Sequence, residues 1–278
     1  MPVLTEHQLR IGDRAITLLE GPAGWGEYSP LPGYPSEPAA CRAAAEEAAL
    51  VRFPPPVRDA VPVNALVDGP FVIADLRAFP AVKVKVRDAS GISLVAAVRD
   101  AVGPHVGVRV DANGAWDVDT AVTMIGRLAR YDLEYVEQPV TTLDDLARVR
   151  RRVDVPVAAD ECVRSRADAA RLRTLDAADV IVLKQQPLGG VRAALEIAAT
   201  AGVPAVVSSM METSVGIAAG LALAAALPEL PYACGLATLA ALPGDVTRDP
   251  LVPVDGVLWV RGVTPDVDLL ARYQDVSR

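Results

Sequence analysis

Short runs of valine, alanine and isoleucine recur along most of the chain and predict a series of strands. We place eight of them, at residues 62–67, 81–86, 106–111, 133–137, 155–160, 179–184, 204–208 and 231–235. In the segments between them apolar residues return at helical spacing, as in Leu143, Leu146 and Val149. Because strands that alternate with helices are joined by parallel crossovers, the pattern predicts an α/β fold.

The ends of the predicted strands are evenly spaced. Counting from Lys85, they fall at intervals of 26, 26, 23, 24 and 24 residues, at Asp111, Glu137, Asp160, Lys184 and Ser208. Such regularity over eight units predicts a closed (β/α)₈-type barrel rather than an open doubly wound sheet. We expect the barrel to span residues 59–255, which is compact for this fold, so its helices should be short.

Residues 1–58 do not follow the repeat and predict a small appended α+β domain. They suggest a hairpin, then a loop at 21–35, then an alanine-rich helix that begins near Ser36 or Glu37. The glycines and prolines of residues 24–34 suit a lid over a site, although they are also the ordinary residues of turns. We expect the strand-like tail, residues 256–278, to return to this domain.

Composition and charge exclude several classes of protein. The chain has 278 residues, 51% of them hydrophobic, and its net charge is −8, with no basic run longer than Arg150–Arg152, so we expect no nucleic-acid partner. It lacks an apolar stretch of about eighteen residues and an apolar signal-peptide core, which predicts a cytoplasmic protein with no membrane partner. Cys41, Cys162 and Cys234 lack metal-ligand spacing and, with only two histidines, predict no cysteine or histidine metal site.

Lysine is rare in this chain and occurs only in strand-like runs. Of the 27 basic residues only three are lysine, namely Lys83, Lys85 and Lys184. Arginine stays protonated at any accessible pH, whereas a buried lysine can lose its proton and act as a base. We therefore take the three lysines as candidate catalytic groups. The alternative is a codon bias that left three lysines by chance, which composition alone leaves open.

Charged residues end five consecutive predicted strands. In a (β/α)₈ barrel the reacting groups come from the C-terminal strand ends, which here carry Lys85, Asp111, Glu137, Asp160 and Lys184. Three carboxylates meeting at one end would repel one another unless a cation joined them, and all-oxygen ligation favours Mg²⁺, with Mn²⁺ as the second choice. The alternative is that each acid is a helix N-cap or an ordinary loop residue, which are common roles just after a strand. Five charges at corresponding positions favour the metal site.

The alternation of side chains along a strand assigns their faces. Lys83 and Lys85 share one face, and the valines that alternate with them share the other, which should face the helices. By the same rule Arg109 lies on the inner face with Asp111 and Asn113. Arg109 would then be buried beneath the site, where it would need a carboxylate partner.

Five motifs, in this order along the chain, resemble those of one known family. They are KVK (83–85), VDANGAW (110–116), VEQP (136–139), AADE (158–161) and VLKQQPLGG (182–190). Together they span nearly the whole barrel and resemble the enolase superfamily, specifically its muconate lactonizing subgroup. The resemblance implies a (β/α)₈-type barrel with a truncated N-terminal α+β capping domain, shorter than the cap usual in the family.

The resemblance also implies roles for the residues at the strand ends. Asp111, Glu137 and Asp160 would bind Mg²⁺, and Lys85 and Lys184 would be the catalytic groups on opposite faces of the substrate. The supporting residues that it implies are Lys83, Asn113 and Glu161. The substrate-binding residues that it implies are Ser208, Ser209 and Gly235.

Within the subgroup, the loop GWGEYSPLPGY and the segments SSMMETSVG and CGLATL resemble those of a dehydratase. The chain would then be a metal-dependent hydro-lyase that acts on a small carboxylate through an enolate. Racemisation of N-succinylamino acids and cycloisomerisation of muconate use the same metal and lysines and stay open as alternatives. Dipeptide epimerisation is disfavoured, because CGLAT lacks the acidic DxD pair of those enzymes. A non-catalytic binding barrel, with the charges as a salt-bridge network, is the alternative of a different class. The oligomeric state is left open.

Overall fold

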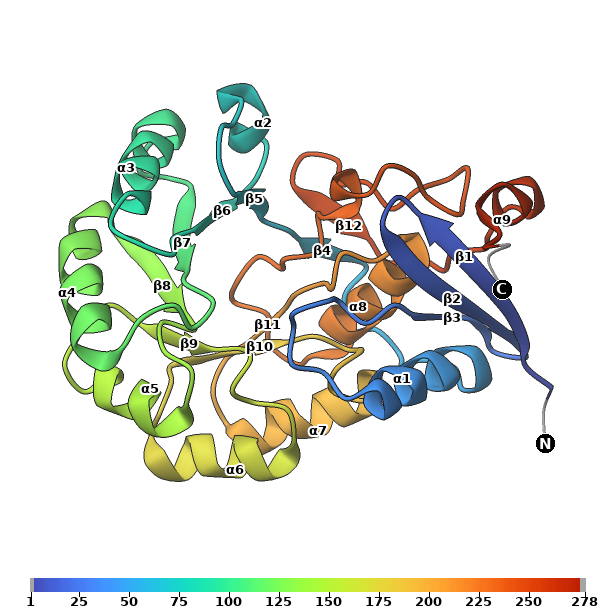
Figure 1. Ribbon diagram of the computed structural model, residues 1–278, viewed down its shortest axis with the longest axis horizontal. Helices are drawn as coiled ribbons and strands as arrows, with labels where there is room; N and C mark the ends of the chain where they lie inside the picture. The colour runs from blue at the N-terminus through green and yellow to red at the C-terminus, as the bar shows by residue number, and fades with distance from the viewer. Residues whose placement is uncertain (1–2, 276–278) are drawn as a thin grey trace.

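The chain folds into a small antiparallel sheet beside a larger, curled parallel sheet (Figure 1). The structure is a computed structural model that describes residues 3–275, so the ends of the two predicted terminal segments, 1–2 and 276–278, lie outside it. The small sheet contains β1 (Thr5–Ile11), β2 (Arg14–Gly21) and β3 (Gly24–Tyr28), and α1 (Pro38–Leu50) packs against it.

The larger sheet is parallel and its strands follow one another in chain order. They are β5 (Ala65–Val67), β6 (Ala81–Lys85), β7 (Gly107–Asp111), β8 (Leu133–Glu137), β9 (Val157–Ala159), β10 (Val180–Leu183) and β11 (Ala205–Val207). The connecting helices are α2 (Ile73–Arg77), α3 (Gly91–Val102), α4 (Val118–Leu128), extended by η1 (Ala129–Tyr131), α5 (Leu143–Arg150), α6 (Arg166–Leu175), α7 (Val191–Ala201) and, after β11, α8 (Ser214–Ala226). Helices α3 to α7 line the outside of the curled sheet (Figure 1). The predicted fold class is confirmed.

The predicted eighth strand, residues 231–235, does not form as an extended strand. Only two of its residues pair, Cys234 with Val63 and Gly235 with Ser208, both as isolated parallel bridges. The segment begins with a proline, which has no N–H to donate to a ladder. The two bridges nevertheless join the two edges of the sheet, so the barrel is closed by a much shorter segment than predicted.

The small domain differs from the prediction at one place. Residues 24–28, predicted within a loop, form β3, which pairs antiparallel with β2. Gly26 is required there by packing, because a Cβ atom would lie 1.9 Å from the carbonyl oxygen of Ala45 in α1. The remaining connection, residues 29–37, is called here the β3–α1 loop. Helix α1 begins directly after its N-cap Glu37, as predicted.

The tail contacts both parts of the molecule. Strand β12 (Val257–Trp259) pairs antiparallel with β4 (Ala60–Pro62), which precedes β5, so the predicted strand 62–67 is divided into β4 and β5. The short η2 (Leu239–Ala241) lies between α8 and β12. After β12, α9 (Val267–Tyr273) contacts β1, and Gln274 bridges Leu9. No helix within residues 3–275 is both long and apolar enough to cross a membrane.

The two faces of β6 and β7 differ as the alternation predicts. Val82 and Val84 are fully buried in the apolar core, whereas Lys83 is buried among carboxylates. Arg109 is also fully buried, and its Nε lies 2.9 Å from Glu134 Oε2. Its guanidinium further donates to the hydroxyl of Tyr135 at 3.0 Å. The predicted carboxylate partner of Arg109 is therefore present, and a polar layer underlies the site.

Candidate active site

The charged residues predicted at the strand ends gather at one end of the barrel. Lys85, Asp111 and Glu137 are the last residues of β6, β7 and β8, and Asp160 and Lys184 directly follow β9 and β10. The three carboxylates are each 1% exposed. Since buried acids are rare unless they are paired, this cluster needs positive charge close by.

The three acids are not helix caps. The helices that follow β7, β8 and β9 are capped by the side chains of other residues, which are Asp117, Thr142 and Ser165. Each of these accepts a hydrogen bond from a backbone N–H of the first helical turn. The N-cap interpretation of Asp111, Glu137 and Asp160 is therefore wrong, and their charges require another explanation.

The three lysines pair with the three carboxylates. The Nζ atom of Lys83 lies 2.9 Å from Glu137 Oε1 and 3.2 Å from Asp111 Oδ2. Lys85 Nζ lies 2.6 Å from the same oxygen of Asp111. The ammonium of Lys184 bonds to Asp160 Oδ2. Each carboxylate thus contacts at least one ammonium group, but Glu137 shares that of Lys83 with Asp111.

The pKa values of Glu137 and Asp111 are shifted in opposite directions. Burial, reinforced by the charge of Asp111, raises the pKa of Glu137 to about 8. Burial acts in the same direction on Asp111, but Lys83 and Lys85 outweigh it and lower its pKa. The positive charge of the lysines is therefore shared unevenly, and Glu137 in particular lacks a full counter-charge. An added cation would relieve this imbalance.

The donor set suits a hard divalent cation. It consists of carboxylates on three consecutive strands, with no thiolate or imidazole, and oxygen ligands are those that Mg²⁺ prefers. In the present arrangement the ammonium groups hold the carboxylate oxygens. Within residues 3–275 no three acidic, histidine or cysteine side chains converge on one position where a metal could sit. A metal here would replace ammonium contacts that exist now, so the residues fit Mg²⁺ by chemistry and would have to rearrange to bind it.

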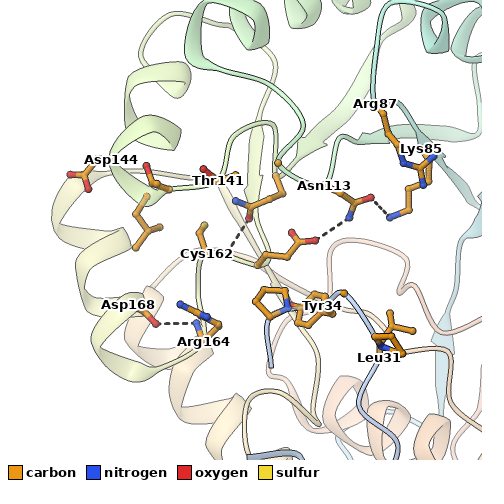
Figure 2. Close-up of a pocket in the computed structure, with 18 of the residues that line it drawn as sticks. Leu31, Tyr34, Lys85, Arg87, Asn113, Thr141, Asp144, Cys162, Arg164 and Asp168 are labelled. Atoms are coloured by element: carbon orange, nitrogen blue, oxygen red, sulfur yellow. Dashed lines mark hydrogen bonds between the residues drawn. The ribbon is translucent and has the colours of Figure 1, made fainter. Parts of the chain in front are cut away.

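Asn113 connects Lys85 to Glu161, and Figure 2 shows its bond to Lys85. Its Oδ1 accepts from Lys85 Nζ at 2.7 Å, and its Nδ2 donates to Glu161 Oε1 at 3.0 Å. Its backbone has φ +47°, in a left-handed region that asparagine tolerates better than most residues. Burial, and then the charge of Asp160, raise the pKa of Glu161. These bonds fix the amine of Lys85 between Asn113 and Asp111.

A cavity of about 110 Å³ lies within this cluster and is called here the inner cavity. The predicted site residues that line it are Lys83, Lys85, Asp111, Asn113, Lys184, Ser208, Ser209 and Gly235. The hydroxyl of Ser209 lies 2.6 Å from that of Thr238. A side chain at Gly235 would enter this space, since its Cβ atom would lie 2.6 Å from the hydroxyl of Ser208. The structure therefore brings the predicted substrate-binding residues to the same cavity as the lysines.

A larger cavity of about 950 Å³, called here the outer cavity, adjoins the first (Figure 2). It lies between the β3–α1 loop and the loops that follow β6 to β9, and Glu161 lines it. Leu31, Tyr34, Lys85 and Asn113 line both cavities. The boundary between the two spaces is therefore formed partly by the β3–α1 loop.

Two residues at the site were not singled out from the sequence. Gln138 Oε1 accepts from the backbone N–H of Asp160 at 2.8 Å and so fixes the end of β9. The hydroxyl of Tyr34 donates to Asp160 Oδ1 at 2.8 Å. Gln138 belongs to the VEQP motif, which gave a signal, whereas Tyr34 lies in a loop whose sequence suggested a lid without indicating which side chain enters the site.

A second group of buried carboxylates joins the small domain to the barrel. Glu27 of β3 accepts hydrogen bonds from the hydroxyls of Ser29 and Thr213 and from the backbone N–H of Gly216. The carboxyl group of Glu212 is also buried and lies close enough to act on it electrostatically. Burial, and then the charge of Glu212, raise the pKa of Glu27 to about 7. The contact between the two domains therefore contains a group that titrates near neutral pH.

We expect Glu27 to make the stability of the protein depend on pH. Because folding raises its pKa from 4.5 to about 7, its contribution is fully present below pH 4.5 and is lost as the pH rises through 7. Glu27→Gln cannot ionise. The free energy of unfolding of the wild type, relative to that of this variant, should fall by about 3 kcal/mol between pH 4.5 and 7.5. Urea unfolding of both proteins across this range measures the difference, and a pH-independent difference would contradict the prediction.

A parallel (β/α)₈-type barrel with acids and lysines at its strand ends defines an enolase-like protein. Residues 72–265 match the family described as Enolase C-terminal domain-like, and residues 9–49 match Enolase N-terminal domain-like. The first match alone covers more than half of the chain. The chain therefore belongs to the enolase superfamily, as the sequence motifs predict.

Similar proteins indicate which members of the superfamily this chain resembles in sequence and in fold. The chain is 57% identical to a Thermobifida fusca protein named o-succinylbenzoate synthase, over 96% of this chain and 89% of that protein. It is 47% identical to a protein of the same name from Mycolicibacterium smegmatis, over 93% of this chain and 83% of that protein. Among solved structures, a muconate cycloisomerase from Pseudomonas fluorescens has a TM-score of 0.84 at 22% identity, covering 98% of both chains. This last likeness concerns the fold alone.

Proposed function

We propose that this chain is an o-succinylbenzoate synthase. The reaction removes water from 2-succinyl-6-hydroxy-2,4-cyclohexadiene-1-carboxylate in a syn elimination and yields o-succinylbenzoate, a step of menaquinone biosynthesis. The observation that carries the proposal is that Lys85 and Lys184 line the same inner cavity. They come from the ends of β6 and β10, and three strands lie between these two in the sheet. The identity to two o-succinylbenzoate synthases over nearly the whole chain supports this choice of substrate.

In the proposed mechanism Lys85 acts first as a base and then as an acid. Its Nζ takes the proton beside the substrate carboxylate, and then donates a proton to the departing hydroxyl, which leaves as water. The hydrogen bonds from Lys85 to Asp111 and Asn113 hold the amine in one position through both steps. Lys184 would stay protonated on the opposite side and lie over the ring as a cation facing a π system.

The carboxylates supply the second part of the proposed site. Asp111, Glu137 and Asp160 would hold Mg²⁺ or Mn²⁺, whose charge would stabilise the second negative charge that develops on the substrate carboxylate. Lys83 keeps Asp111 and Glu137 oriented through its two ion pairs. Asn113 and Glu161 orient Lys85, a supporting role that metal sites commonly need. The succinyl arm would bind at the serine and glycine residues of the inner cavity, which are Ser208, Ser209 and Gly235.

A direct assay tests the proposed function. Purified protein with Mg²⁺ should convert the cyclohexadiene acid to o-succinylbenzoate. Chromatography of the product measures this conversion. Chelation of the metal should stop the reaction, and added Mg²⁺ should restore it. N-succinylamino acids and muconate are tested in parallel. Rapid racemisation of the former, or cycloisomerisation of the latter, without any dehydration would contradict the proposal, and no turnover of any of the three would favour a binding protein.

We further propose that the protein acts in the cytoplasm on a small carboxylate. Its three cysteines are free, as is usual for proteins of reducing compartments. The net charge of −8 disfavours an electrostatic partnership with nucleic acid. Cell fractionation with an antibody against the chain tests the compartment, and recovery in a membrane fraction would contradict it.

A further inference from the structure

Tyr34 of the β3–α1 loop, which is labelled in Figure 2, contacts two groups that the proposed reaction uses. Its hydroxyl donates to Asp160 Oδ1 at 2.8 Å. The Nζ atom of Lys184 lies 4.1 Å from the centroid of its ring, within the usual range of a cation–π contact. One side chain of the small domain therefore engages a proposed metal ligand and a proposed catalytic lysine at the same time.

The phenol is held as a hydrogen-bond donor. A tyrosine hydroxyl is protonated at neutral pH, and at 2.8 Å from Asp160 Oδ1 that of Tyr34 has a carboxylate oxygen to donate to. A protonated hydroxyl donated to a carboxylate is among the stronger hydrogen bonds in proteins, because the acceptor carries a full charge. The Tyr34 contact therefore competes directly with anything else that would bind that oxygen of Asp160.

The inner cavity is too small for the substrate while Tyr34 stands beside it. Its volume of about 110 Å³ compares with roughly 300–1,000 Å³ for typical small-molecule sites. A water molecule occupies about 30 Å³ in the liquid, so the space suits a few waters rather than a ring with two acidic groups. The outer cavity, at about 950 Å³, has ample room. Because Tyr34 lines both, its departure would join them.

The β3–α1 loop is anchored at its base, while its tip has open space beside Gly33. Buried Arg14 donates to the carbonyl of Ser29 at 2.6 Å, and the N–H of Ser29 donates to Gln186 Oε1 at 2.9 Å. At the tip, Gly33 has φ +83° and open space around the position of a Cβ atom, next to Tyr34. The base can therefore stay fixed to the barrel while the tip carries the phenol in and out.

We propose that Tyr34 occupies the place of the substrate ring on Lys184 and of the metal on Asp160, and leaves both when they bind. The inference rests on the proposed function and adds a competitor built into the chain. The phenol presents a planar aromatic ring to Lys184, which is what the product o-succinylbenzoate would also present. Its hydroxyl satisfies the carboxylate that the metal would otherwise bind. The loop thus keeps the site closed between turnovers.

The first test measures metal binding without turnover. Tyr34→Phe keeps the ring and removes the hydroxyl, so Asp160 loses a competitor and Mn²⁺ should bind roughly three- to tenfold more tightly, as measured by electron paramagnetic resonance. Tyr131→Phe is the matched control, because Tyr131 ends η1 just before β8 begins, at the opposite end of that strand from the site. It should bind Mn²⁺ as the wild type does. Equal affinity in Tyr34→Phe and wild type would overturn the proposal.

The second test measures entry of the ring. With metal saturating, the hydroxyl of Tyr34 has left Asp160, but in the wild type its ring still lies over Lys184 until the product arrives. The product o-succinylbenzoate should therefore associate roughly tenfold faster with Tyr34→Ala than with wild type, as measured by stopped-flow tryptophan fluorescence. Slower association would make Tyr34 a binding contact and overturn its role as a competitor. If the wild type binds product and Mn²⁺, and the Tyr34 variants bind them with the same rate and affinity, this inference alone is refuted. Wild-type protein that binds neither refutes the proposed function, and this inference with it.

Discussion

Replacing Lys85 with alanine is expected to reduce turnover at least roughly thousandfold while the fold and the metal affinity persist. A positioned acid or base typically contributes ~10²–10⁴-fold, and Lys85 is proposed to act as both in one cycle. Lys85 is also the lysine whose amine is fixed by Asn113 and lines both cavities, where an incoming substrate meets it. The rate at saturating Mg²⁺ and substrate measures the effect, with circular dichroism and Mn²⁺ titration as checks of the fold and the metal site.

Lys85→Arg separates the role of the proton from that of the charge. Arginine keeps a positive charge and can still donate hydrogen bonds to Asp111 and Asn113, but it does not give up its proton at any accessible pH. Both variants should therefore be equally inactive if Lys85 is the base. Substantial activity in the arginine variant would mean that positive charge alone is needed at this position. Wild-type activity in the alanine variant would remove Lys85 from the mechanism.

The charged cluster could be predicted because the repeat has a nearly constant length. A constant interval places residues that end successive strands at one end of a parallel barrel, whatever the details of the helices between them. Asp111, Glu137 and Lys184 could therefore be grouped from their positions alone. The N-cap alternative could be rejected only with the structure, because caps and strand-end acids lie within a few residues of each other, as Asp111 and Asp117 do.

Other features depend on contacts between distant segments and left no periodic signal. Tyr34 and Asp160 are 126 positions apart, and nothing in a loop rich in glycine and proline indicates which side chain will enter the barrel. The glycines of residues 24–28 predict a loop, whereas Gly26 allows the close packing of β3 on α1. The closing segment pairs only at Cys234 and Gly235, and their partners Val63 and Ser208 lie far away in the chain, so a local pattern does not reveal where the pairing stops.

Asp160→Asn is expected to weaken Mn²⁺ binding roughly a hundredfold or more, and to reduce turnover with it. The amide keeps the shape of the side chain, and the backbone N–H of residue 160 can still bond to Gln138. What is lost is one of three carboxylate charges in the buried set that we propose as metal ligands, and the binding of hard divalent cations depends strongly on such charge. Titration with Mn²⁺ by electron paramagnetic resonance gives the affinity directly, independent of any assay of the reaction.

The adjacent residue provides the matched control. Glu161→Gln makes the same chemical change one position further along, but the Glu161 carboxylate accepts from Asn113 and belongs to the support of Lys85 rather than to the proposed ligand set. Its Mn²⁺ affinity should change less than about tenfold, while turnover falls because the Lys85 amine is held less firmly. Equal losses of affinity in both variants would indicate a general loss of negative potential around the cavity, and Asp160 would no longer be distinguished as a ligand. A loss of Mn²⁺ affinity confined to Asp160→Asn would place the cation at the end of β9, within reach of the hydroxyl of Tyr34 and the amine of Lys184.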